Sequence, residues 1–280
     1  MTYATLLMPL VDSARADAHV DVAARLARRF ESHVIALSSV GRLPSQMGPA
    51  MAAYGSGNAN YVLADLRKDA EERAQRFAAA AAACGLVDAE TLVDDDEDYE
   101  ALVTHARCAD LVLLGQPDPR AAHAAAGRAL LDRALLGIAP PCLLVPYAGE
   151  VRTLGTNVLV AWNDSRPCTR AIIAALPFLR EAATVHLMQC DAPTGSGGDA
   201  LHPRLQAAAT WLGRHGVKVQ ASLETTEIDY GNALLSRASD LGVDLLVAGA
   251  WSHSRIGERL FGGVTRTLLD SMTVPVLMAH

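Results

Sequence analysis

Two similar stretches of the sequence reveal how the chain is organised: ADLVLLG at residues 109–115 and VDLLVAG at residues 243–249. Each has an aspartate, then an apolar run, then a glycine, and the two lie 134 residues apart. At the same offset, PCLLVP at 141–146 aligns with PVLMAH at 275–280 without a gap. Matches in the same order and at constant spacing indicate a tandem duplication.

The start of each repeat carries a third match, between MPLVDS at 8–13 and VAWNDS at 160–165. The stretch YAGEVRTLGT at 147–156 separates the repeats. A chain of 280 residues is also long enough for two domains of ordinary size. We therefore expect an N-terminal domain over residues 1–150 and a C-terminal domain over residues 151–280.

Short apolar strands alternate with helical patterns in each repeat. In the second repeat, NVLVAW at 157–162 and TVHLMQ at 184–189 are typical of strands buried in a parallel sheet. Between them, one helical face carries Ile172, Ala175, Leu176 and Leu179. This alternation predicts an α/β fold of two tandem, doubly wound, Rossmann-like domains, each with a five-stranded parallel sheet covered by helices on both faces.

The first repeat contains an additional segment at 41–60, rich in Gly, Pro, Ser and other small residues. We expect it to be a mobile loop that leads into a long helix containing DLRKDAEERAQRFAAAAAAC (65–84). The acidic cluster at 94–98 is expected to be a solvated loop before a helix N-terminus, where negative charge is favourable. A metal site is the alternative for these carboxylates.

Composition excludes several classes of protein. The net charge of −7 and the 5% aromatic content argue against a nucleic-acid-binding protein. No run of 18 apolar residues is present to cross a membrane, and the N-terminal TLLMPLV lacks the flanks of a signal peptide. Five widely spaced cysteines favour reduced thiols over a disulfide framework or zinc site. We expect a cytoplasmic protein.

The C-terminal half offers a candidate ligand site. In an open α/β sheet, ligands bind at the carboxyl ends of the strands. Three segments of this half follow strands: NDS at 163–165, the region of Gln189, and GAWSHSRIGERLFGGVT at 249–265. We expect Gly249 to let the backbone turn sharply away from its strand.

The third segment has features of an anion-binding loop. Gly262 and Gly263 come directly before a helical pattern, where backbone N–H groups can approach a phosphate. Thr265 places a hydroxyl in the first turn, to cap the helix or contact a phosphate, and Arg255 could donate charge-assisted hydrogen bonds. A glycine-rich loop that only connects a strand to a helix explains the glycines equally well.

The chain resembles the universal stress protein (UspA) family. DLLVAGAWSHSRIGERLFGGVTRTLLDSMTVPVLMAH (244–280) is similar to the family's C-terminal segment, and NVLVAWNDSRPCTRAIIAALPFL (157–179) to its first strand and helix. With two repeats, the chain resembles the tandem type. The resemblance implies a stress-response protein that binds ATP through G-x-x-G-x9-G-[S/T], with a divalent ion, Mg²⁺ or Mn²⁺, bridging the phosphates.

The family motif maps onto the second repeat with departures. Its first and third glycines fall on Gly249 and Gly262, whereas Ser252 replaces the second. The family's acidic residue after the first strand falls on Asn163. The resemblance and the strand ends together give these nucleotide contacts: Asn163, Asp164, Ser165, Gln189, Gly249, Ala250, Ser252, Arg255, Gly262, Gly263, Val264 and Thr265. No catalytic or metal-ligating residue is predicted.

The first repeat lacks these features. At the 134-residue offset, Arg128 and Ala129 replace the two adjacent glycines, and Asp118 replaces Ser252. The position of the acidic residue is held by Val11. Asp118 would repel a triphosphate. We therefore expect at most one nucleotide per chain.

Three functions remain open from the sequence. The first is regulatory ATP binding in the C-terminal domain, with slow hydrolysis at most. The second is a nucleotide-free scaffold or interaction protein with a relic site. The third, an ATP-using enzyme, needs a catalytic acid or lysine, and none is assigned near the motif. The resemblance also implies that PCLLVP and VPVLMA pair the repeats as an intrachain pseudo-dimer, with a homodimer and an unidentified protein as further partners.

Overall fold

The computed structural model describes all residues except 1, 14, 42–54, 193–200 and 252–262, and it describes no side chains for 55–60. The chain divides into two compact units, Thr2–Pro140 and Pro141–His280. The last strand of the first repeat, β5 (Cys142–Val145), is grouped with the second unit because it pairs with a strand there.

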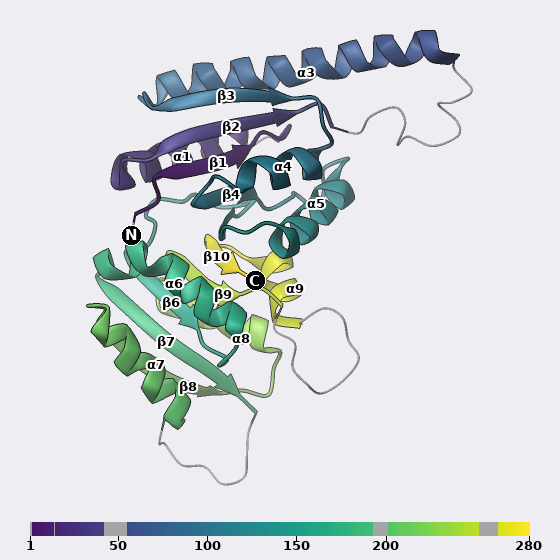
Figure 1. The fold of residues 1–280 in the computed structure, drawn as a ribbon. Coiled ribbons are helices and arrows are strands. Elements are labelled where there is room, and N and C mark those ends of the chain that lie inside the picture. Colours follow the sequence, from purple (N-terminus) through teal and green to yellow (C-terminus); the bar gives the residue numbers. More distant parts are fainter. Residues whose placement is uncertain (1, 14, 42–54, 193–200, 252–262) are drawn as a thin grey trace. The chain divides into compact units, whose positions relative to one another are not determined.

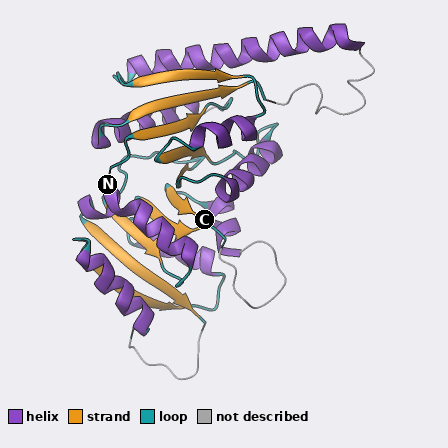
Figure 2. Ribbon diagram, viewed as in Figure 1, coloured by secondary structure: helices purple, strands orange, loops and turns teal. Residues whose placement is uncertain are grey.

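The unit Thr2–Pro140 is built around a parallel sheet (Figure 2). Its strand order is β3–β2–β1–β4. The strands are β1 (Thr5–Pro9), β2 (His33–Ser39), β3 (Ala89–Asp94) and β4 (Leu111–Gly115). The helices are α1 (Ala16–Phe30), α3 (Gly55–Ala83), α4 (Asp98–Ala106) and α5 (Ala124–Gly137). Helix α1 packs beside α3, and α4 packs beside α5.

The unit Pro141–His280 repeats this arrangement (Figure 1). Its strand order is β8–β7–β6–β9–β10–β5, in which β5 is antiparallel to β10 and the other pairs are parallel. The strands are β6 (Asn157–Ala161), β7 (Thr184–Asp191), β8 (Val219–Thr225), β9 (Leu245–Gly249) and β10 (Val276–Ala279). The helices are α6 (Arg166–Glu181), α7 (Pro203–Arg214), α8 (Tyr230–Asp240) and α9 (Gly263–Ser271). The doubly wound α/β fold is confirmed, as is the pairing of the last strands of the two repeats.

An aspartate fixes the start of the first strand in each repeat. The Asp110 carboxylate accepts hydrogen bonds from the backbone N–H groups of residues 4 and 5, at 2.8 and 2.9 Å. The Asp244 carboxylate accepts the corresponding bonds from residues 156 and 157, both at 2.9 Å. These bonds explain why both of the matched stretches, 109–115 and 243–249, carry an aspartate before the apolar run.

The helical face predicted in the second repeat is confirmed. Ile172, Ala175, Leu176 and Leu179 are all buried in α6. The expected loop at 41–60 is partly wrong, because α3 already begins at Gly55. Once formed, a helix extends one hydrogen bond per residue, so a helix of good helix formers can run back through less favourable residues. Residues 42–54 lie outside the described part of the chain.

The acidic cluster lies where it was expected. Asp94 ends β3, and α4 begins at Asp98. The Asp94 carboxylate is 2.7 Å from His105 Nε2, and Asp95 pairs with Arg67. Across the described residues, no three His, Cys, Asp or Glu side chains are grouped so that they could hold a metal ion.

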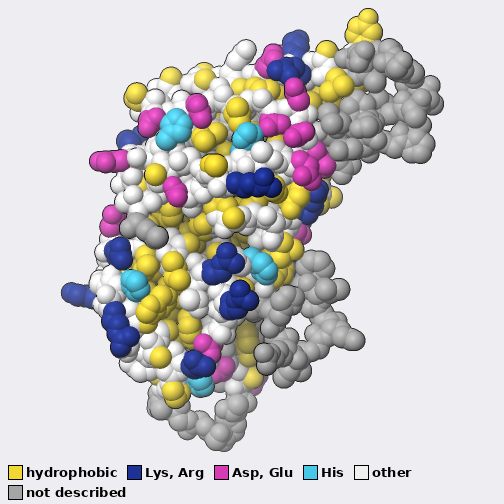
Figure 3. Space-filling view, viewed as in Figure 1, with side chains coloured by type: hydrophobic (Ala, Val, Ile, Leu, Met, Phe, Trp, Pro, Cys, Tyr) yellow, Lys and Arg dark blue, Asp and Glu magenta, His cyan; other side chains and the backbone are white. Residues whose placement is uncertain are grey.

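None of the helices in the described part of the chain is both long and apolar enough to cross a membrane. On the face drawn in Figure 3, the Lys and Arg side chains of the described residues form separate groups and no continuous basic stripe.

Candidate functional site

The candidate site lies at the carboxyl edge of the sheet in the unit Pro141–His280. Strands β6 and β9 are parallel neighbours there, with Val160 paired to Val247. Residues 162–165 follow β6, residues 250–251 follow β9, and the described part of α9 begins at Gly263. Segments far apart in the sequence therefore supply the residues that were predicted for this site.

The loop after β6 is fixed by the start of α6. Ser165 is the N-cap residue: its Oγ accepts a hydrogen bond from Cys168 N–H at 3.3 Å and donates one to Asn163 Oδ1 at 2.6 Å. Asp164 has a left-handed backbone with φ 53°, and its carboxylate lies 3.4 Å from Arg204 Nε. Asn163 and Asp164 are exposed, so this loop presents polar groups at the edge of the sheet.

Gln189 lies beside this loop. It is half-buried in β7, the strand next to β6. The backbone N–H of Trp162 donates to Met188 O at 2.8 Å, which holds the start of the loop against β7. The Gln189 amide donates to Asp191 Oδ2 at 3.2 Å. The structure therefore brings Gln189 and residues 163–165 to the same part of the edge.

Gly249 has a different role from the one expected. It is not at positive φ; the residue in the left-handed region after β9 is Trp251, with φ 42°. A Cβ at Gly249 would lie 2.5 Å from Cys168 N and 2.8 Å from the carbonyl carbon of Pro167. The expectation of a turn at Gly249 is corrected, because glycine is needed there for the close approach of the α6 backbone.

Thr265 ties Trp251, which follows β9, to α9. Its side chain is buried, and its Oγ1 accepts a hydrogen bond from Trp251 N–H at 3.1 Å. Ala250, also buried, donates from its N–H to Ala279 O at 2.8 Å, and its carbonyl lies 2.9 Å from His280 Nδ1. Both residues position the start of the loop.

The start of α9 presents a glycine to solvent. Gly263 is exposed and Val264 is half-buried. A Cβ at Gly263 would lie 3.6 Å from Asp229 Oδ2, an ordinary contact. Because Gly263 has no side chain, its backbone at the start of α9 is open to solvent.

Asp229 was missed by the sequence analysis. It is the N-cap residue of α8, and its Oδ1 accepts a hydrogen bond from Asn232 N–H at 3.1 Å. An aspartate directly before a helical pattern is the signal that could have identified it. Because its carboxylate lies beside the start of α9, a divalent cation there could be held by Asp229 together with the oxygens of a bound phosphate.

The thiols at this edge are not activated. Burial raises the pKa of Cys168 to about 12 and the pKa of Cys190 to about 11. A cysteine acts as a nucleophile through its thiolate, so neither is suited to covalent catalysis. The predicted contacts Ser252, Arg255 and Gly262 lie outside the described residues.

The corresponding part of the first repeat is built differently. Ala129, which aligns with Gly263, is the sixth residue of α5, so its N–H lies within the helix. Asp118 pairs with Arg120 at 3.0 Å, and hydrogen bonds from Arg120 hold the pKa of the Asp118 carboxyl below its usual value. The helix start and the glycines of the second repeat are both missing at these positions.

Comparison with known proteins finds similarity to one family. Residues 156–280 match the model of the universal stress protein family. A universal stress protein of Synechocystis sp. is 28% identical over 171 residues, a match that covers 60% of this chain and only 57% of that protein.

Solved structures support the fold of the whole chain. A universal stress protein from Archaeoglobus fulgidus DSM 4304 has a TM-score of 0.73 at 14% identity, covering 99% of this chain and 98% of the other. A functionally unknown protein from Pseudomonas aeruginosa PAO1 has a TM-score of 0.60 at 16% identity, covering 98% and 92%. The resemblance inferred from the sequence is confirmed.

Proposed function

We propose that this chain, whose residues 156–280 belong to the universal stress protein family, is a cytoplasmic stress-response regulator that binds one ATP in its C-terminal domain. The observation that carries the proposal is the exposed Gly263 at the start of α9, next to Asp229. Helix N-terminal N–H groups and the helix dipole favour a bound phosphate.

The phosphates contact the loop between β9 and α9. Backbone N–H groups of Gly262, Gly263 and Val264 donate to phosphate oxygens, and Arg255 adds a charged donor. Gly249 and Thr265 act indirectly, by shaping the site. Gly249 lets α6 approach β9, and Thr265 ties Trp251 to α9. Ala250 and Ser252, in the same stretch of the sequence, are the remaining proposed contacts.

The adenosine lies at the ends of β6 and β7. Asn163, Asp164 and Ser165 present polar groups there, and the Gln189 amide is close to them in the sheet. An amide at position 163, in place of the family's carboxylate, can both donate and accept hydrogen bonds.

A divalent ion, Mg²⁺ or Mn²⁺, accompanies the nucleotide. The fit depends on Asp229, whose carboxylate would otherwise repel phosphates at the start of α9. When bound, the ion supplies charge neutralisation between this carboxylate and the phosphate oxygens. The chain binds the nucleotide rather than turning it over, with hydrolysis slow at most, because no catalytic residue is assigned at this site.

The second candidate is a nucleotide-free scaffold that acts through a protein partner or as a homodimer. Two departures from the family pattern favour it: Ser252 in place of a motif glycine, and Asn163 in place of an acidic residue. Under this alternative, the second repeat would have the same role as the first.

Calorimetric titration with ATP and Mg²⁺ distinguishes the two candidates. We expect the wild-type chain to bind ATP and Gly263→Asp to weaken binding by about 100-fold, because the new carboxylate repels the phosphates. The matched control is Ala129→Asp at the aligned, exposed position of the first repeat, which should bind like the wild type. If Gly263→Asp binds ATP as tightly as the wild type and melts at the same temperature, the assignment of the phosphate site is contradicted. If the wild type gives no heat on titration with ATP, the scaffold is favoured.

A further inference from the structure

The first repeat contains a cavity of about 460 Å³ at the carboxyl end of β1. Its walls are residues 8–13 at the end of β1 and after it, the first two turns of α1, and residues 73–80 of α3. All of these belong to the unit Thr2–Pro140. The cavity is therefore separate from the nucleotide site proposed for the second repeat.

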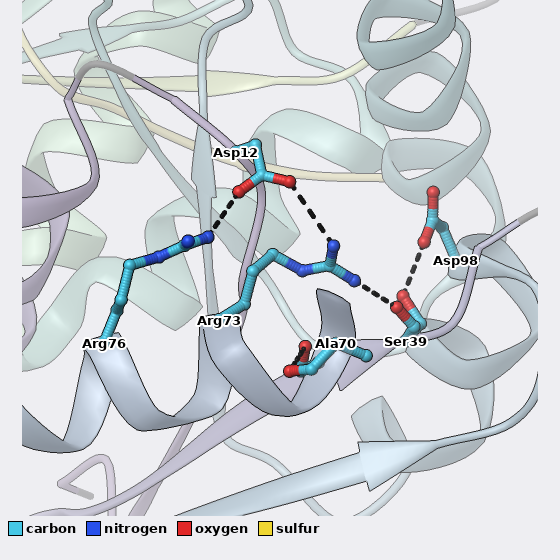
Figure 4. A network of polar contacts seen from close by, with 7 residues as sticks. Asp12, Ser39, Ala70, Arg73, Arg76 and Asp98 are labelled. Atoms are coloured by element: carbon cyan, nitrogen blue, oxygen red, sulfur yellow. Dashed lines mark hydrogen bonds and ion pairs between the residues drawn. The ribbon is translucent and has the colours of Figure 1, made fainter. Parts of the chain in front are cut away.

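Two arginines from α3 line this cavity (Figure 4). Arg73 is largely buried, with a side chain 15% exposed, and its Nη2 donates to Ser39 O at 2.5 Å. Its Nη1 lies 3.4 Å from Asp12 Oδ2, and its buried Nε has no hydrogen-bond partner among the described residues. Arg76 Nη2 is 2.6 Å from the other oxygen of Asp12.

This arrangement leaves the Arg73 guanidinium incompletely paired. A guanidinium presents a planar set of N–H donors that suits a bidentate anion. Asp12 is shared between two arginines and is 68% exposed, so its ion pairs are weak and replaceable. A buried N–H without a partner is unfavourable, and an acceptor that reached it would relieve that cost. The polar wall of the cavity is thus suited to an anion.

The rest of the cavity combines apolar side chains with the polar residues Ser13, Asp17 and His19. Phe77 and Ala80 continue the α3 wall, and Val20 contributes from α1. His19 also lines it, with a buried Nε2 that has no partner in the described part of the chain. Burial, aided by Arg15, lowers the pKa of His19 to about 4, so the imidazole is neutral at pH 7 and can accept or donate one hydrogen bond.

We infer that this cavity binds a small amphipathic organic acid, with its anionic group on Arg73 and Arg76 and its apolar body against Phe77 and Val20. Asp12 is the internal competitor that the ligand displaces from the arginines. The inference does not depend on the proposed nucleotide binding, because no residue of the second repeat takes part.

The probe for the test is anilinonaphthalene sulfonate, an aromatic anion, alongside its uncharged analogue phenylnaphthylamine. We expect the sulfonate to bind once per chain, by fluorescence and calorimetry, and the uncharged analogue to bind at least tenfold more weakly. Arg73→Met with Arg76→Met should weaken sulfonate binding at least tenfold. Asp12→Asn should tighten it severalfold, because the competing carboxylate is gone. The matched control on the same helix is Arg67→Met, because Arg67 is half-exposed and pairs with Asp95. This variant should bind the sulfonate like the wild type.

The opposite results would overturn the inference. Equal binding of the sulfonate to the double arginine variant, or equal binding of the uncharged analogue, would show that the arginines hold no anion. Weaker binding in Asp12→Asn would contradict the role of Asp12 as competitor. Displacement by ATP with Mg²⁺, or by equimolar inorganic phosphate, would show that the probe occupies the nucleotide site or a plain anion site. Should the double arginine variant fail to fold by circular dichroism, Asp12→Asn and the uncharged analogue decide the outcome.

Discussion

The two repeats share a framework and differ at the carboxyl edge of the sheet. Both have the same order of four parallel strands and the same aspartate at the start of the first strand. In the second repeat, the glycine that ends β9 faces the backbone of α6. In the first, the matching Gly115 faces the imidazole of His19. The duplication has thus kept the strand framework, whereas the groups that cover the strand ends have diverged.

The largest expected effect tests which groups contact these two glycines: backbone at Gly249 and a side chain at Gly115. Gly249→Ala should destabilise the protein by about 3 kcal/mol, because the backbone at Cys168 cannot move away without shifting α6. Gly115→Ala should cost about 1 kcal/mol, since the His19 side chain can adopt another rotamer. Urea denaturation measures both effects.

The control for this comparison is Gly115→Ala combined with His19→Ala. Removing the imidazole should relieve most of the clash in the first repeat, so the two changes should not be additive. Equal destabilisation by Gly249→Ala and Gly115→Ala would show that the two glycines are covered in the same way.

The second effect concerns pH and belongs to the first repeat alone. His19 has a pKa of about 4 in the folded chain against an ordinary value of 6.5, so the unfolded state binds more protons between these values. Stability from the neutral imidazole is present above pH 6.5 and is lost as the pH falls toward 4. Relative to His19→Leu, the wild type should lose about 2 kcal/mol between pH 6.5 and 4.5 in urea denaturation. Parallel pH profiles would contradict the burial of a neutral His19.

The smallest effect tests the shared framework. Asp110→Ala and Asp244→Ala should each lower the free energy of unfolding by about 1 kcal/mol, because each removes a partly exposed carboxylate from backbone N–H groups. Similar values in urea denaturation would support equivalent roles. A loss confined to one of the two variants would mean that the repeats no longer share this feature.

The sequence predicts the fold well because the fold depends on local patterns. Apolar runs and helical periodicity identify strands such as β9 and the buried face of α6, and the repeat spacing shows the duplication. The beginning of α3 at Gly55 was not predicted, since Gly, Ser and Asn residues there indicate a loop.

Less of the candidate site could be predicted, because it depends on contacts between distant segments. The close approach of Cys168 to Gly249 joins residues far apart in the sequence, and no local pattern reports it. The same holds for Asp229 beside Gly263. Thr265 was expected near a phosphate or as a cap. In the structure its hydroxyl instead accepts a hydrogen bond from the backbone N–H of Trp251, a contact between separate segments.

The nucleotide content of the purified protein tests the central claim, that only the second repeat binds ATP. The protein is denatured, and the released adenine nucleotides are measured by chromatography for the wild type, Gly263→Asp and Ala129→Asp. We predict close to one ATP per chain for the wild type and for Ala129→Asp, and almost none for Gly263→Asp. Close to two per chain, or an undiminished content in Gly263→Asp, would contradict the claim, as would a wild type that carries no nucleotide and gives no heat with ATP and Mg²⁺.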